Sequence, residues 1–198
     1  MALADAQSLA IRKLLSKSAY DSTITPGPPL PKSHPSPALI AKLHLECASL
    51  YSSARSLAKT PSSTKSKGKG KELSGADGEV SADLRRYLSD ESAFHGALAR
   101  KWLGVDAGEN GGPQKGGEAV AFLVWAKKEL EELKDGGRGF GIGREKEKKD
   151  RRKDKVMEEL ERVTMFWKHY KKLNDSVSRN TPRGIVKMLM SCDLSSSR

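Results

Sequence analysis

The chain has 198 residues, 36 of them lysine or arginine against 25 aspartate or glutamate, which gives a formal net charge of +11. At about 150 residues per domain, this length predicts a single domain and excludes two full ones. Residues of the AVILMFWYC set make up 36% of the chain, slightly below the globular average even with glycine added, so we expect part of the chain to lie outside the core. The positive charge favours acidic partners such as nucleic acid, anionic lipid or acidic protein segments.

The cysteine count and the hydropathy exclude further classes of protein. Cys47 and Cys192 are the only cysteines, too few for a disulfide framework or a cysteine zinc site. No apolar run approaches the roughly 18 residues of a membrane-spanning helix, and residues 1–10 lack the charged segment that opens a secretory signal. These features predict a soluble protein in a reducing intracellular compartment.

Two helices joined by a proline-rich connector are predicted at the start of the chain. Apolar residues near the 3.6-residue helical period indicate an amphipathic helix over residues 3–19. Its apolar positions are Leu3, Ala6, Leu9, Ala10, Leu14 and Tyr20. Prolines crowd residues 26–35 and predict an extended connector, because each proline fixes its own φ and disfavours helix before it. Ser36-Pro37 then supplies an N-cap and a first-turn proline for a second helix that ends before Thr60-Pro61.

A low-complexity segment follows the second helix. Residues 62–78 (SSTKSKGKGKELSGADG) contain a single large apolar residue, Leu73. Since burial of one side chain cannot offset the entropy of ordering such a segment, we predict a disordered Ser/Lys/Gly loop over residues 60–79.

Three more helices are predicted in the second half of the chain. The third runs from Val80 to Leu103 with Gly104 as its C-cap, and after a glycine-rich turn the fourth ends at Gly136-Gly137. The fifth begins in a charged run, residues 144–155, and continues as a coiled-coil-like seam. The seam consists of Val156, Leu160, Val163, Trp167 and Tyr170. With no sustained strand pattern, the sequence predicts an all-α fold of long antiparallel helical hairpins, packed as in solenoids or bundles.

The residue types that carry catalysis or metal binding do not converge in the sequence. The four histidines fall on the connector and on three separate helices. Glu91 and His95 stand at i, i+4, a metal-ligand spacing, but the second histidine of the zinc-protease pattern is missing, so a structural role is favoured. The glycine run over residues 137–143 lacks the preceding strand and the lysine of a phosphate-binding loop. We therefore expect no catalytic residue, no metal site and no cofactor.

Two basic segments keep nucleic-acid binding open as an alternative function. Residues 65–71 and 144–155 would both attract phosphate. Neither contains the aromatic residues that stack on bases, and the second alternates in sign like a solvated helix face, so a solvated surface is favoured over a dedicated site. Trp102, Trp125 and Trp167 lie within helical patterns, which favours the core over an apolar groove for all three.

Several segments together resemble the Bro domain family, which has a boomerang-shaped helical fold. They are LADAQ and LIAKL, which open the first two helices, and further along AFHGALARKWLGVDAGE, GGEAVAFLVWAKKELEELKDG and FWKHYKKLNDSVS. Within this family the fungal pH-response regulators are most similar. The resemblance covers residues 1–178 and corresponds to the C-terminal half of a complete Bro domain, whereas residues 179–198 diverge and are expected to form a disordered tail.

The resemblance implies a non-catalytic adaptor in ESCRT-linked signalling of ambient alkaline pH. Such a protein is cytoplasmic and is recruited to endosomal or plasma-membrane sites through the C-terminal amphipathic helix of the Snf-seven-type ESCRT-III subunit. Other components of pH signalling, and a weak contact with anionic membranes, are the further partners that the resemblance implies. Nucleic acid is not among them.

The resemblance also places a docking patch for the partner helix on the first two helices. Its anchors fall on Leu39 and Leu43, Ala10 stands where the family has a larger side chain, and Lys13 and Lys42 flank them. Leu39 and Leu43 at i, i+4 project from one helix face, and the lysines suit an acidic partner. Burial of both leucines in the core is the alternative that the spacing leaves open.

Overall fold

The computed structural model describes residues 1–20, 27–58, 80–135 and 144–180. This part of the chain contains five α-helices, one short 3-10 helix and no strand, which confirms the predicted all-α class. The elements are α1 (Ala2–Tyr20), α2 (Pro37–Leu57), α3 (Ala82–Asn110), η1 (Pro113–Lys115), α4 (Gly116–Asp135) and α5 (Arg144–Asn180). The predicted loop over residues 60–79, the glycine run and the predicted tail from residue 181 onwards lie outside the described residues.

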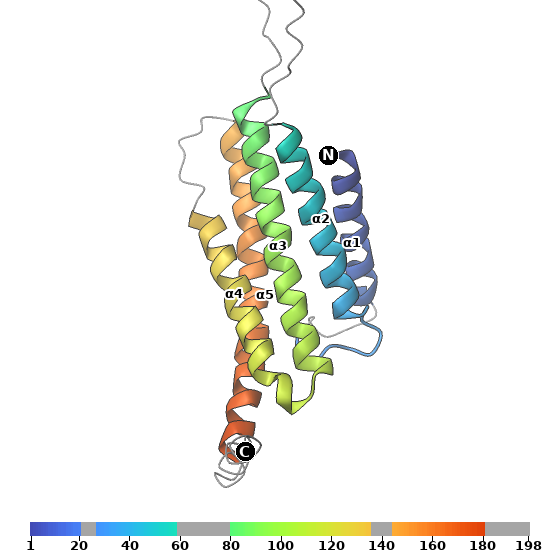
Figure 1. Ribbon diagram of the computed structural model, residues 1–198, viewed down its shortest axis with the longest axis vertical. Coiled ribbons are helices and arrows are strands. Elements are labelled where there is room, and N and C mark those ends of the chain that lie inside the picture. Colours follow the sequence, from blue (N-terminus) through green and yellow to red (C-terminus); the bar gives the residue numbers. More distant parts are fainter. Residues whose placement is uncertain (21–26, 59–79, 136–143, 181–198) are drawn as a thin grey trace, which may run out of the picture.

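The helices run alternately up and down, so that helices that follow one another in the chain are antiparallel neighbours (Figure 1). α1 lies at one edge of the stack against α2, and α3 stands in the middle. None of the described helices is both long and apolar enough to cross a membrane. The connector before α2 is non-helical as predicted, but it turns rather than running straight, because the His34 N–H donates to the Pro31 carbonyl oxygen at 2.9 Å.

The main core runs through the stack, between α2 and α3, between α3 and α4, and between α4 and α5. Its most completely buried large side chains include Ile40, Val105, Leu123, Leu130 and Val163. Full burial of one such side chain stabilises the fold by about 1.5–3 kcal/mol, so this cluster supplies much of the driving force for the helical stack. The predicted seam of α5 is confirmed at Val156, Val163 and Tyr170, which are buried, whereas Leu160 and Trp167 are only partly buried.

The third helix does not end where the sequence predicts. α3 continues past Gly104 to Asn110, and Gly111 is the residue that follows its end. The reason for Gly104 is packing: a Cβ there would lie 2.8 Å from Leu123 Cγ of α4 and 3.0 Å from the Ala119 carbonyl oxygen. Glycine costs about 1 kcal/mol within a helix, and here it permits the close approach of α3 and α4.

The apolar stripe predicted for the first helix is also placed differently. Leu3 and Leu9 are 66% and 64% exposed, and the residues that α1 buries are Ala4 and Ile11. Helical periodicity fits both sets, but the inner side of α1 is also anchored by polar bonds. The Tyr51 hydroxyl donates to Asp5 Oδ1 at 2.6 Å, which turns the other side of the helix outward.

Candidate functional site

The five residues of the predicted docking patch lie on α1 and α2. Leu39 is 48% exposed, and Leu43 is partly buried against the core. Ala10, Lys13 and Lys42 are exposed. We call these five residues the α1–α2 patch.

Hydrogen bonds between α1 and α2 fix the register of the patch. Gln7 Nε2 donates to the Leu43 carbonyl oxygen at 3.3 Å and to Glu46 Oε2 at 2.9 Å. Because the helices are antiparallel, Ala10, one turn after Gln7, lies level with the turn of α2 that holds Leu39 and Leu43. Ala10 is therefore at the same height along the two helices as Leu39 and Leu43, and Lys13 is one turn further along α1.

The two lysines give the α1–α2 patch a positive rim. Neither Lys13 nor Lys42 has an ion-pair partner among the residues that the structure describes. Exposed ammonium groups of this kind add little stability to a fold, but they raise the rate and the selectivity of association with acidic partners.

Two histidines that the sequence places on separate helices are in contact. His44 of α2 and His95 of α3 are buried, with their Nδ1 atoms 2.8 Å apart, and the Tyr51 ring stacks on His95 at a centroid distance of 5.6 Å. Burial and the neighbouring positive groups lower the pKa of His44 to about 3 and that of His95 to about 4. Both imidazoles are therefore neutral at neutral pH, and one Nδ1–H donates to the other Nδ1. Sequence spacing carries no signal for a pair between helices.

The histidine pair lines a crevice between α1 and α5 of about 1110 Å³. Ile11, Leu98 and Phe166 form its apolar walls, and the Nε2 atoms of both histidines have no hydrogen-bond partner in the described part of the chain. General bases work best with a pKa near the operating pH, so imidazoles with pKa values of about 3 and 4 are weak bases at pH 7. No cluster of three or more metal-ligating side chains occurs within the described ranges.

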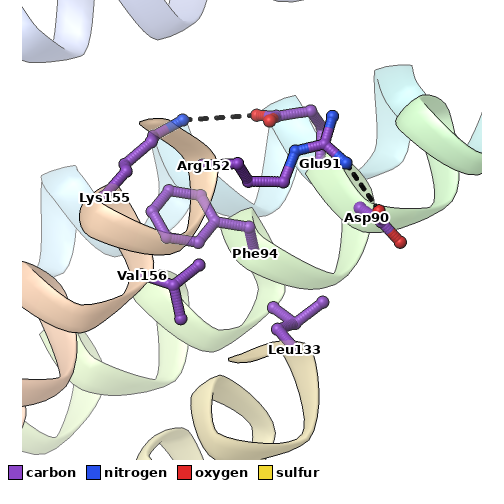
Figure 2. Close-up of a pocket in the computed structure, with 7 residues that line it drawn as sticks. All are labelled: Asp90, Glu91, Phe94, Leu133, Arg152, Lys155 and Val156. Atoms are coloured by element: carbon purple, nitrogen blue, oxygen red, sulfur yellow. Dashed lines mark hydrogen bonds and ion pairs between the residues drawn. The ribbon is translucent and has the colours of Figure 1, made fainter. Parts of the chain in front are cut away.

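Ion pairs between helices account for the role of Glu91 and of part of the basic run of α5. Lys155 Nζ lies 3.4 Å from Glu91 Oε2, and Arg152 Nη1 lies 2.6 Å from Asp90 Oδ2. Figure 2 shows both pairs bridging α3 and α5 above Phe94. These basic side chains hold two helices together, whereas the other basic segment, residues 65–71, lies outside the described residues.

Trp125 corrects the expectation that all three tryptophans lie in the core. Trp102 is buried, but Trp125 is 51% exposed on α4, and the Arg100 guanidinium lies 4.2 Å from the centre of its ring. The tryptophan sits next to Ala126, which takes the buried position of the helix. A cation over the ring face, rather than core packing, is what covers Trp125 on one side.

Comparison with known proteins identifies a relative of this chain. The chain is similar to the pH-response regulator protein palC of Cryptococcus neoformans var. neoformans serotype D, with 41% identity over 201 aligned residues. The alignment takes in 89% of this chain and 41% of the relative, so the chain spans about two fifths of the length of the protein it matches. No family profile and no solved structure matches the chain. The resemblance to the fungal pH-response regulators is confirmed.

Proposed function

Since the chain is PalC-like over most of its length, we propose that it is a non-catalytic adaptor of ambient alkaline pH signalling. Its partner is the C-terminal amphipathic helix of the Snf-seven-type ESCRT-III subunit, which recruits it from the cytoplasm to endosomal or plasma-membrane sites. The role in the pH response comes from the relative, which is called a pH-response regulator. The Bro-type docking mode comes from the sequence resemblance.

The observation that carries the proposal is the half-exposed side chain of Leu39, in a patch whose Ala10, Lys13 and Lys42 are also exposed. A fully buried leucine contributes about 1.5–3 kcal/mol, so covering the exposed half of Leu39 contributes about 1 kcal/mol to binding. An amphipathic helix covers such a surface with apolar anchors one turn apart, and its acidic edge suits Lys13 and Lys42. The affinity then rests on apolar contact, with charge as a secondary contribution.

Titration with a fluorescent peptide of the ESCRT-III C-terminal helix tests the proposal, with circular dichroism of the same protein sample. We expect saturable binding that changes little between low and high salt, and at least tenfold weaker binding by the Leu39→Asp variant. Leu45→Asp is the matched control, because Leu45 is also 48% exposed but lies about 120° around the helix from Leu39.

Two outcomes would contradict the proposal. If the wild-type chain is folded but does not bind the peptide, the proposed adaptor function is wrong. Binding of nucleic acid instead, with an affinity that falls steeply as salt rises, would establish the alternative based on the basic segments.

A further inference from the structure

The side of α1 that faces away from the stack has the character of a buried helix face. Leu3, Ala6, Leu9 and Ala10 are all exposed, and the two leucines keep about two thirds of their surface in contact with solvent. At 3.6 residues per turn these four positions cover an arc of about 120°. A stripe at least about 100° wide is what a helix normally turns toward a core.

The sequence of α1 keeps charge off this arc until its second half. Asp5 is turned inward, where it accepts hydrogen bonds from Tyr51 at 2.6 Å and Tyr87 at 3.4 Å. The first charged side chain on the outer arc is Lys13, which is exposed. Single exposed leucines are ordinary, but a continuous apolar arc on one helix marks a surface that another molecule covers.

We propose that this outer arc of α1, residues 3–10, is the main contact for the partner helix, which lies alongside α1 as one more helix of the stack. The inference rests on the proposed function and enlarges its site. Ala10 belongs to both surfaces, so the arc and the α1–α2 patch are continuous. A helix seated on both surfaces also reaches Leu39 and Leu43 of α2.

The geometry of the arc defines the chemistry of its occupant. Ala6 and Ala10 stand one turn apart, so a second helix can approach closely between the flanking Leu3 and Leu9 side chains. The occupant therefore has large apolar side chains on one face. Because Lys13 follows the arc on the same side of α1, acidic residues of the occupant lie at the end near Lys13.

The decisive variant is Leu9→Asp, because Leu9 lies on the flank of the arc furthest from Ala10 and α2. In the same peptide titration we expect its Kd to rise at least tenfold, and that of Leu3→Asp to rise as much. Leu45→Asp again serves as the control and should bind like the wild type. Circular dichroism should show unchanged helicity for all three, since each of these leucines is exposed.

Each failure has a separate meaning. If Leu39→Asp loses binding while Leu9→Asp binds like the wild type, the outer arc is not part of the site and the proposed function stands. If the wild type does not bind at all, the proposed function fails and this inference with it. If sedimentation shows a wild-type dimer that Leu9→Asp converts to a monomer, a second copy covers the arc and the inference is wrong.

Discussion

Mild acid should destabilise this protein through its buried histidine pair. An imidazole has an ordinary pKa of 6.5, and in the fold the pKa is lowered to about 3 for His44 and about 4 for His95, chiefly by burial. Between pH 6.5 and pH 4 the unfolded chain therefore binds protons that the folded chain does not. The free energy of unfolding rises with pH in this window and falls as the solution is acidified.

The size of the effect follows from the distance between the working pH and the ordinary pKa. At pH 5 each unfolded imidazole lies about 1.5 units below its pKa, which is worth about 2 kcal/mol at 1.36 kcal/mol per unit. The pair then costs about 4 kcal/mol between pH 7 and pH 5. This is a large share of the 5–15 kcal/mol that typically stabilises a domain.

Charged groups near the histidine pair do not offset this pH dependence of stability. Glu159, whose pKa is lowered to about 2 chiefly by Lys101 once its burial is overcome, loses its stabilising contribution only as pH falls below the ordinary carboxyl range. Half-buried His34, with its pKa also lowered by burial, acts in the same direction as the pair.

Urea denaturation followed by circular dichroism at pH 7, 6 and 5 measures the effect. The wild type should lose about 4 kcal/mol over this range, and His95→Gln, with one buried imidazole fewer, should lose about half as much. A wild-type free energy of unfolding that is the same at pH 7 and pH 5 would refute the reasoning, as would an equal loss in the variant.

Two further predictions concern packing and a buried ion pair. Gly104→Ala should cost about 1–3 kcal/mol of stability, because the new Cβ would lie 2.8 Å from Leu123 Cγ. Gly117→Ala is the control and should be neutral or stabilising in thermal denaturation, because nothing lies within 4 Å of its Cβ position. Equal effects of the two substitutions would contradict the explanation. Lys101→Met should cost about 3 kcal/mol of stability, because it removes the ion-pair partner that lies 2.7 Å from Glu159. Arg162 still contacts that carboxylate in the variant. Unchanged urea denaturation would show that the Lys101–Glu159 pair makes no net contribution to stability.

Much of the helical architecture could be predicted from the sequence, because helix starts and long apolar repeats are local signals. Pro37 begins α2 as expected, and Val156, Val163 and Tyr170 are buried on α5 as their spacing predicts. Ser36 occupies the N-cap position of α2, although its side chain makes no capping hydrogen bond. Local chemistry thus places an element more reliably than it places individual contacts.

The errors arise where a neighbouring helix decides the outcome. Gly104 reads as a cap in isolation and is instead a point of close contact with α4. Leu9 fits the helical period as well as Ile11 does, and contacts with α2, among them the Tyr51–Asp5 hydrogen bond, go with the burial of the Ile11 side of α1. The contact between His44 and His95 joins residues 51 positions apart, which no local pattern encodes.

The limited burial of α1 against the rest of the stack has a consequence for its motion. α1 buries Ala4 and Ile11, far fewer side chains than α3 buries, and Leu15 packs partly against the core. Hydrogen bonds of Gln7 and Asp5 with α2 add to these contacts. A helix with few buried apolar contacts opens at a lower free energy than the core, so its amide protons exchange with solvent sooner. A molecule that covers α1 would then slow this exchange, and occupancy of the edge helix becomes visible in the dynamics of the chain itself.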